Sequence, residues 1–366
     1  MSKMSDILII GGGIIGMLTA RELSLAGMTV TIVEQSQAGH ESSWAGGGII
    51  SPLYPWRYSD SVSALAKWGQ AFYPQLIDEI NSETGLDAEL TKSGLLILGY
   101  DEQDVALEWT RAWQVNLQLI EDKEIFELEP KLSPEIIKNQ KAIWMPGVSQ
   151  VRNPRLVKTL RKYIEQQGVK FKEQSKVIDF VINNNKVSGV KTLEGEILAD
   201  QVIVAGGAWT ANLLEKTNIS LNIEPVKGQM ILFKTRANAI KRIVLSEDRY
   251  IIPRRDGRVL VGSTLEYTGF DKSTSDKARQ DLYQEALRLI PELEKSEIEH
   301  QWAGLRPSSP NGVPYICEHP EIKGLYINSG HFRNGVVLGP ASARLMADIV
   351  LQRDPILDIK GYQSLR

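Results

Sequence analysis

Hydrophobic positions recur along this chain with two spacings, one typical of helices and one of strands. Spacings of three and four residues predict helices over residues 17–26, 61–83, 101–116, 154–167, 274–289 and 341–352. Short apolar or alternating runs predict strands over residues 6–10, 29–33, 94–98, 170–171, 176–182, 186–192, 201–205, 229–234, 250–253, 259–262 and 325–329. Hairpin turns are predicted at residues 183–186, 193–196 and 256–257. The pattern therefore predicts an α/β fold.

The loop between the first strand and the first helix carries a phosphate-binding pattern. Gly11, Gly13 and Gly16 give the spacing GxGxxG directly after an apolar strand and at the start of a helix. The first glycine permits a tight turn, the second lets the backbone approach a pyrophosphate, and the third lets the helix pack closely on the strand. The second strand ends at Glu34, which is placed to accept hydrogen bonds from a ribose. These features favour a dinucleotide site over a glycine turn without a nucleotide.

The order of the elements indicates two domains that are discontinuous in sequence. The nucleotide-binding half comprises residues 1–84, 146–214 and 303–366. The intervening residues 85–145 and 215–302 are richer in hairpins, which predicts a mainly antiparallel second domain that covers the first. We therefore expect a Rossmann-like domain joined to a discontinuous antiparallel domain, with the site at their interface.

Two further glycine-rich segments are candidates for contact with the cofactor. Residues 39–51 contain three consecutive glycines, and residues 52–58, the aromatic segment, follow directly. We interpret the glycines as backbone packed against a flat ring and the aromatic segment as a lid; a flexible loop is the alternative for the former, and an interface for the latter. An apolar strand also runs into Gly206, Gly207 and Trp209, which predicts either a cofactor contact or an ordinary strand-to-helix turn.

Two arginines lie between glycine and proline residues. Arg306 stands between Gly304 and Pro307, and Arg333 lies in the glycine-bounded residues 330–335, ahead of a helix that reaches Val350. Guanidinium groups bind carboxylates through two parallel hydrogen bonds, so two arginines in tight loops indicate a carboxylate clamp rather than solvated side chains. The sequence has no GxSxG motif and no Cys–His pair in a convincing context, so we expect a cofactor to carry the chemistry.

Composition narrows the classes of partner. The 366 residues have a net charge of −3, without the basic excess typical of nucleic-acid binding. A single cysteine, Cys317, leaves no intrachain disulfide, and four histidines without metal-ligand spacing predict no metal site. No apolar run reaches the length of about 18 residues that a membrane span needs, and no secretion signal is evident, so we expect a cytoplasmic protein.

The motifs together resemble the FAD-dependent glycine oxidases of the D-amino-acid oxidase superfamily, the group that supplies iminoglycine for thiazole formation in thiamine synthesis. The similarity covers residues 6–354 and rests on residues 10–16, 41–48, 225–229 (PVKGQ), 250–254, 261–264, 302–307 and 330–335. It implies non-covalent FAD, because Cys317 does not stand where the related sarcosine oxidases attach their flavin. The cofactor-binding residues that motif and resemblance imply are Gly11, Gly13, Ile14, Ile15, Gly16, Glu34, Gln35, Ser42, Ser43, Gly46, Gly47, Gly48, Ile49, Val177, Gly207, Trp209, His331, Phe332, Arg333, Asn334, Gly335, Val336 and Val337.

For the substrate, the resemblance implies a carboxylate held by Arg306, with Tyr250 and Arg333 beside it. It implies oxidative deamination of glycine, sarcosine and small D-amino acids by hydride transfer to FAD, which yields the imine or 2-oxo acid, ammonia and hydrogen peroxide. Leu265 and Glu266 follow the strand where sarcosine oxidases carry an oxygen-activating lysine. Asp248 stands where some glycine oxidases have a histidine. The acceptor and the substrate range are therefore left open.

Two other functions are alternatives. A D-amino-acid or D-proline dehydrogenase would pass electrons to a quinone, and the apolar residues 49–58 would then touch a membrane or an acceptor. A tRNA-modifying flavin domain would need a basic face or an attached methyltransferase domain, and the sequence has neither. The expected partners are a small amino acid and O2, with no nucleic acid and no membrane span, and self-association into a homo-oligomer is left open.

Overall fold

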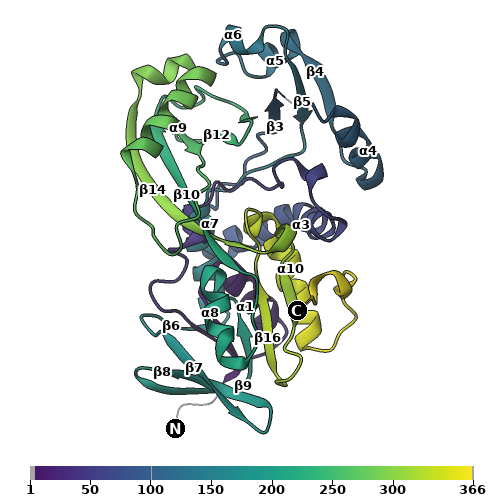
Figure 1. The fold of residues 1–366 in the computed structure, drawn as a ribbon, viewed down its shortest axis with the longest axis vertical. Coiled ribbons are helices and arrows are strands. Elements are labelled where there is room, and N and C mark those ends of the chain that lie inside the picture. The colour runs from purple at the N-terminus through teal and green to yellow at the C-terminus, as the bar shows by residue number, and fades with distance from the viewer. Residues whose placement is uncertain (1–4, 100, 365–366) are drawn as a thin grey trace.

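Two eight-stranded sheets form the two halves of the molecule, one above the other in Figure 1. The computed structural model describes residues 5–99 and 101–364. Both chain ends lie in the lower half of the view, with the first sheet. The chain passes twice into the upper half and returns each time. The predicted α/β class with a Rossmann-like part is confirmed.

The first sheet is built around parallel strands. β1 (Ser5–Ile10) pairs in parallel with β2 (Val30–Val33) and with β9 (Gly195–Val204). The other strands of this sheet are β6 (Lys170–Lys172), β7 (Val177–Asn183), β8 (Lys186–Thr192), β15 (Tyr315–Glu318) and β16 (Leu325–Ser329). Ile7 and Ile9 of β1 join one core, whereas Leu8 and Ile10 join another, which includes β7, β8 and α8 (Thr210–Leu214). Because both its faces are buried, β1 reads as an unbroken apolar run.

Four helices share the core of Ile7 and Ile9: α1 (Ile14–Leu25), α3 (Asp60–Thr84), α7 (Asn153–Gln166) and α10 (Gly335–Val350). The pattern predicted α10 to begin at residue 341, and it begins earlier. Pro340 lies inside the helix and lacks the N–H that would bond the carbonyl of Val336. The Tyr73 hydroxyl of α3 donates to that carbonyl at 2.7 Å instead. A tertiary contact therefore stabilises a helical turn that the sequence disfavours.

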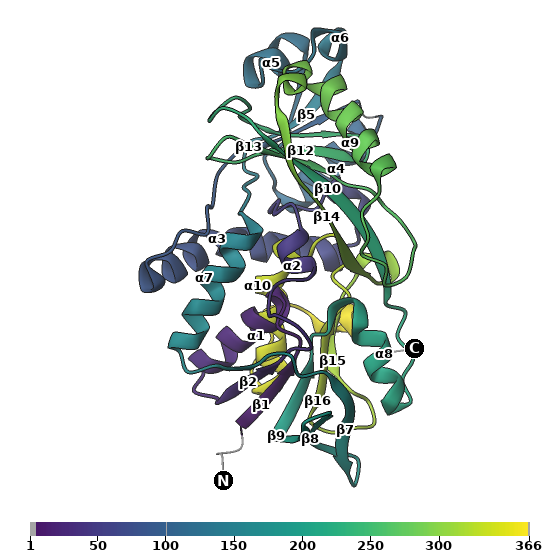
Figure 2. The same ribbon diagram turned by 90° about the vertical axis from the view of Figure 1, so that its left-hand side faces the viewer.

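The second sheet is mainly antiparallel and follows the order β14-β10-β13-β12-β11-β3-β5-β4. Its strands are β3 (Leu95–Leu98), β4 (Gln118–Glu121), β5 (Lys141–Met145), β10 (Glu224–Lys234), β11 (Ile243–Ser246), β12 (Arg249–Pro253), β13 (Arg258–Gly262) and β14 (Glu297–Ser308). One face packs against α9 (Asp276–Leu289), α5 (Asp122–Leu128) and α6 (Pro134–Ile137), and the other packs against α4 (Gln103–Trp113). Figure 2 shows α10 and α2 (Ser42–Ala45) between the two sheets.

The pattern missed β4, β5, β11, β14 and β15, and β14 matters most because it carries Arg306. The expectation that Arg306 stands in a tight loop is wrong, since the residue pairs with Val226 of β10. β14 is an edge strand of its sheet, where Gly304 and Pro307 are tolerated. Because of those two residues and the polar residues before them, the hydrophobic pattern did not predict this strand.

The division of the chain into residues 1–84, 146–214 and 303–366 against residues 85–145 and 215–302 stays a prediction. Its boundary at residue 303 falls inside β14, which pairs with β10 along its whole length. Over residues 5–99 and 101–364, no helix is both long enough and apolar enough to cross a bilayer.

Candidate cofactor and substrate site

A cavity of about 470 Å³ lies between the two sheets and is lined by both. The first sheet contributes the carboxyl ends of its parallel strands, with Ile10 on β1 and Val33 on β2. The second contributes Met230, Tyr250 and Arg306 from β10, β12 and β14. Ligands of open α/β sheets bind beyond the carboxyl ends of the strands, and the volume is in the range of small-molecule sites.

The glycine loop lies where β1 ends and α1 begins. Gly11 has a φ of 106°, in the left-handed region, and a side chain there would overlap the backbone after β9. A side chain at Gly16 would overlap the carbonyl of Gly11, so Gly16 permits the close packing of α1. Gly13 is the N-cap of α1, and Ser43 Oγ accepts the N–H of Ile14 at 2.8 Å. Gly13, Ile14 and Ile15 line the cavity, so the positive end of the α1 dipole lies at its wall.

Glu34 lies at the end of β2 with only 8% of its surface exposed. Its Oε2 accepts the N–H of Gly12 at 2.8 Å, and its Oε1 accepts the N–H of Ser36 at 3.0 Å. A carboxylate offers about four lone-pair sites, so the side chain can still accept hydroxyl donors from the cavity. The ribose-binding role of Glu34 is compatible with this geometry and stays a prediction.

Buried polar side chains hold residues 46–48 along the cavity wall. Arg254 donates to the carbonyl of Gly47 at 2.7 Å, and Asn153 donates to the carbonyl of Ser43 at 2.9 Å. A side chain at Gly47 would contact Tyr250, which leaves room at this position for backbone alone. The glycines therefore bring a fixed backbone surface to the cavity.

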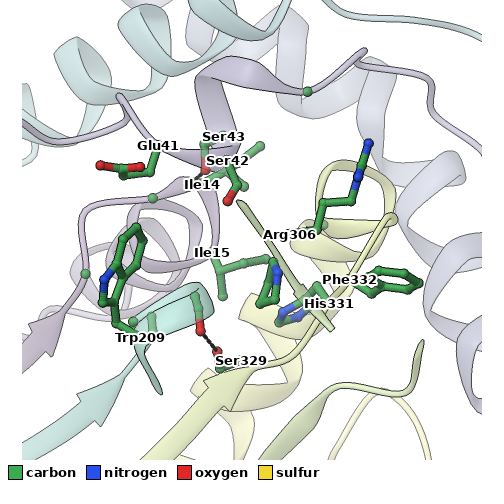
Figure 3. A pocket seen from close by; sticks show the side chains of 18 of the residues that line it. Ile14, Ile15, Glu41, Ser42, Ser43, Trp209, Arg306, Ser329, His331 and Phe332 are labelled. Carbon is green, nitrogen blue, oxygen red and sulfur yellow. Dashed lines mark hydrogen bonds between the residues drawn. The ribbon is translucent and has the colours of Figure 1, made fainter. Parts of the chain in front are cut away.

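Arg306, Tyr250 and Arg333 all line the cavity. Burial lowers the pKa of the Arg306 guanidinium, so a bound carboxylate would compensate a charge that the site desolvates. Arg333 Nη1 lies 4.0 Å from the carboxylate of the exposed Asp248. Figure 3 shows Arg306 on the side of the pocket where His331 and Phe332 lie.

The charged and titratable residues of the lining limit which side chains can act as a base. Burial lowers the pKa of His331 to about 3, and the side chain bonds Ser342 Oγ at 2.9 Å, so His331 is uncharged at neutral pH. Among the described residues that line the cavity, the carboxylates are Glu34 and Glu41. Glu34 is bonded to the glycine loop, and Figure 3 shows Glu41 across the pocket from Arg306. Within the described lining, the surroundings of Arg306 therefore offer no carboxylate as a base.

Most of the predicted site residues meet on this cavity. Those that line it are Gly11, Gly13, Ile14, Ile15, Glu34, Gln35, Ser42, Ser43, Gly46, Gly47, Gly48, Ile49, Val177, Gly207, Trp209, Tyr250, Arg306, His331, Phe332, Arg333, Gly335 and Val336. Gly16, Asn334 and Val337 are not among the lining residues. Gly16 instead permits the packing of α1, and Val337 belongs to the core of the first sheet.

The sequence analysis missed other lining residues. Glu41, Ser263 and Pro307 stand in recognised motifs, so their position in the motif was a usable signal. Ser175, Asn212, Lys216, Met230 and Asn328 carried no local signal, because tertiary packing alone brings them to the cavity.

Two aromatic residues of the aromatic segment, Tyr54 and Trp56, do not line the cavity. Tyr54 and Trp56 are buried, 6% and 7% exposed, and their rings meet edge to face with centroids 5.8 Å apart. Trp56 Nε1 donates to Glu102 at 2.6 Å, next to the start of α4. Leu53 is the residue of this segment that lines the cavity. The expectation that Trp56 forms a lid is therefore wrong.

Comparisons with known proteins agree with one another on the family of this chain. The family described as FAD dependent oxidoreductase matches residues 6–349. A glycine oxidase from Pseudomonas aeruginosa is 48% identical over 97% of each chain, and the bifunctional protein ThiO/ThiG of Trichormus variabilis is 30% identical over 99% of this chain and 55% of its own length. The crystal structure of glycine oxidase from Geobacillus kaustophilus superposes with a TM-score of 0.94 at 30% identity, covering 100% of this chain and 99% of that one. The chain therefore belongs to the FAD-dependent oxidoreductase family and, within it, to the group of the glycine oxidases.

Proposed function

We propose that this protein deaminates glycine and other small amines, including sarcosine and small D-amino acids, with FAD as cofactor. The observation that carries the proposal is that Arg306 and Tyr250 share one cavity with the glycine loop at the start of α1. A carboxylate-binding group and a dinucleotide-binding loop therefore face the same space. The membership in the glycine oxidase group supports the same reaction.

The cavity has groups that suit FAD. The start of α1 suits the pyrophosphate, Glu34 the ribose, Val177 the adenine, and residues 46–48 and 331–337 the ring system. Asn328 Oδ1, on the cavity wall, has no hydrogen-bond partner among the described residues. Buried polar atoms without partners are rare, so this acceptor favours a ligand that carries a donor. FAD, when bound, accepts the electron pair and hydrogen that leave the substrate carbon.

The protein itself orients the substrate. Arg306 binds the carboxylate, with Tyr250 and Arg333 beside it, and the uncharged His331 adds no competing cation. The amine enters neutral, and no side-chain base is needed at the carbon that is oxidised. Fixing the substrate in one orientation in the cavity is the main contribution of the protein to the rate.

The overall reaction balances with oxygen as the acceptor. Glycine, O2 and water give glyoxylate, ammonia and hydrogen peroxide. The reaction runs in the cytoplasm and supplies the imine for thiamine thiazole synthesis. The alternative is a dehydrogenase that contacts a quinone through residues 49–58, and the burial of Tyr54 and Trp56 argues against that contact.

One experiment tests the proposal. The purified yellow protein is mixed without oxygen with glycine, sarcosine, D-alanine or D-proline, and the flavin absorbance is followed. Bleaching by glycine and sarcosine, followed in air by one peroxide per glyoxylate, is the expected result. Bleaching without peroxide in air, restored by a soluble quinone, would establish the dehydrogenase instead.

FAD is expected to be held without a covalent bond. Cys317 lies on β15, is 3% exposed in the core of the first sheet and is not one of the lining residues of the cavity, so its thiol is not placed to bond a cofactor bound there. Acid precipitation should leave all yellow colour in the supernatant. Colour in the pellet that survives washing would contradict this.

Leu53 is expected to limit substrate size. It lines the cavity and packs against the cluster that holds Met230 and Tyr250. Leu53→Ala should raise kcat/KM for D-valine relative to glycine roughly tenfold, since one or two methylenes in a pocket are worth about 1–3 kcal/mol. Trp56→Ala is the matched comparison: it should lower Tm, because a buried ring is lost, and leave the ratio unchanged. An unchanged ratio in Leu53→Ala would remove Leu53 from the substrate pocket.

A further inference from the structure

The guanidinium of Arg306 occupies a fixed place on the backbone of β10. Gly228, in the PVKGQ motif, pairs directly with Gly304, and Val226 pairs with Arg306. The Arg306 side chain therefore reaches diagonally across the strand pair to Gly228. A Cβ at Gly228 would overlap Nη1, Nη2 and Cζ of Arg306, so the planar group lies directly over this glycine.

Two hydrogen bonds hold the guanidinium on that surface. Arg306 Nη2 donates to Ser263 Oγ at 2.6 Å, and Nη1 donates to the carbonyl of Thr264 at 3.2 Å. Ser263 is 3% exposed and lines the cavity. Thr264 is itself tied to β10, because the N–H of Gln229 donates to Thr264 Oγ1 at 2.8 Å. The acceptors of Arg306 are thus fixed to the strand that carries Gly228.

Arg306 needs these fixed contacts because neighbouring positive charges repel its guanidinium. Besides burial, the like charges of Arg333 and Arg249 lower the pKa of its guanidinium, whereas Tyr250 raises it. An arginine without fixed acceptors would move away from them or adopt several rotamers. A bidentate carboxylate contact depends on the orientation of the guanidinium plane, so such movement would weaken substrate binding.

We propose that Gly228 and Ser263 are positioning residues that fix Arg306 for the substrate carboxylate. Two of its N–H groups are bound to Thr264 and Ser263, Tyr250 is a further hydrogen-bond partner, and the guanidinium has five donors in all, so donors remain for the ligand. The proposal rests on the proposed function of Arg306 and adds the reason for the glycine in the PVKGQ motif. Neither residue takes part in the chemistry.

The test measures carboxylate binding separately from turnover. Glycolate, which replaces the amine of glycine by a hydroxyl, is titrated into the FAD-loaded protein, and the flavin absorbance gives Kd. Ser263→Ala should raise Kd about three- to tenfold, the value of one hydrogen bond. Ser263→Thr keeps the hydroxyl and should restore most of the affinity. Gly228→Ala should raise Kd on the order of a hundredfold, because the guanidinium loses its place.

Ser246→Ala is the matched control. Ser246 is a buried serine on β11 of the same sheet, and its Oγ accepts Nη2 of Arg288 at 2.9 Å. The Ser246→Ala variant loses the same kind of hydrogen bond at a place away from the cavity, so its glycolate Kd should stay at the wild-type value. The KM for glycine should rise with the glycolate Kd in the Ser263 variants, whereas turnover of a carboxylate-free amine should not change.

The outcomes separate the two claims. If the wild type binds glycolate but Ser263→Ala and Ser246→Ala have the same glycolate Kd, the positioning role of Ser263 and Gly228 is overturned and the role of Arg306 stands. If the wild type fails to bind glycolate, both the role of Arg306 as carboxylate anchor and the positioning role of Gly228 and Ser263 are overturned. If Gly228→Ala does not fold, the comparison of Ser263→Ala with Ser263→Thr still tests whether the hydroxyl at residue 263 positions Arg306.

Discussion

Replacing Glu34 by alanine is expected to weaken FAD binding by about one to two orders of magnitude. The variant removes the acceptor that we assign to the ribose hydroxyls, and a hydrogen bond to a charged group contributes roughly 1.5–3 kcal/mol. It also removes the acceptor of the Gly12 N–H, which holds the glycine loop at 2.8 Å from Glu34 Oε2. Both losses act on the same ligand. Fluorescence titration of the apoprotein with FAD measures the change.

Two further variants make the result specific. Glu34→Gln keeps one oxygen acceptor without the charge and should bind FAD with an affinity between those of the wild type and Glu34→Ala. Glu196→Ala removes an exposed carboxylate from β9 of the same sheet and should leave the affinity unchanged. Wild-type affinity in Glu34→Ala would exclude the ribose contact and leave Glu34 with a structural role only.

Local motifs carried most of what the sequence could predict. The glycine loop and the two glycine-rich segments could be placed at the cavity directly, because glycine spacing reports backbone conformation over a few residues. The turns at residues 183–186 and 256–257 were equally local, and Asn184, Asn185 and Gly257 have the positive φ values that such turns need. Predictions of this kind do not depend on what the rest of the chain does.

The failures share a tertiary cause. The start of α10 is stabilised across Pro340 by the hydroxyl of Tyr73, a residue on another helix. β14 forms because β10 pairs with it along its whole length, although Gly304 and Pro307 disfavour a strand. Trp56 was read as a lid from its neighbours in sequence, but its position is set by Glu102 and by the packing of α4. In each case a contact with a residue far away in the sequence determined the local structure.

The candidate site shows the same division. Arg306 and Tyr250 could be placed at the cavity from their motifs, but the contacts that hold the Arg306 guanidinium could not, because Gly228 lies on β10 and Ser263 directly follows β13. Strand register places them within reach of one guanidinium. A sequence pattern names the residue that binds a ligand more readily than the residues that fix its orientation.

Arg306→Lys is expected to lower kcat/KM for glycine on the order of a hundredfold, equivalent to about 3 kcal/mol of transition-state stabilisation. Lysine keeps the positive charge but lacks the planar pair of donors, so it cannot hold a carboxylate at two points. It also cannot use the acceptors at Ser263 and Thr264 in the same way, since they are placed for two separate guanidinium nitrogens. Steady-state kinetics with glycine measures the loss.

The controls separate substrate binding from folding and from effects on the flavin. FAD content and Tm should stay near the wild-type values, and Arg288→Lys, on α9 with a comparable serine contact, should keep full activity. Amines without a carboxylate should be poor substrates of the wild type and should lose little further in Arg306→Lys. Equal losses for glycine and for a carboxylate-free amine would mean that Arg306 acts on the flavin or on the fold, and its role as the carboxylate anchor would then be wrong.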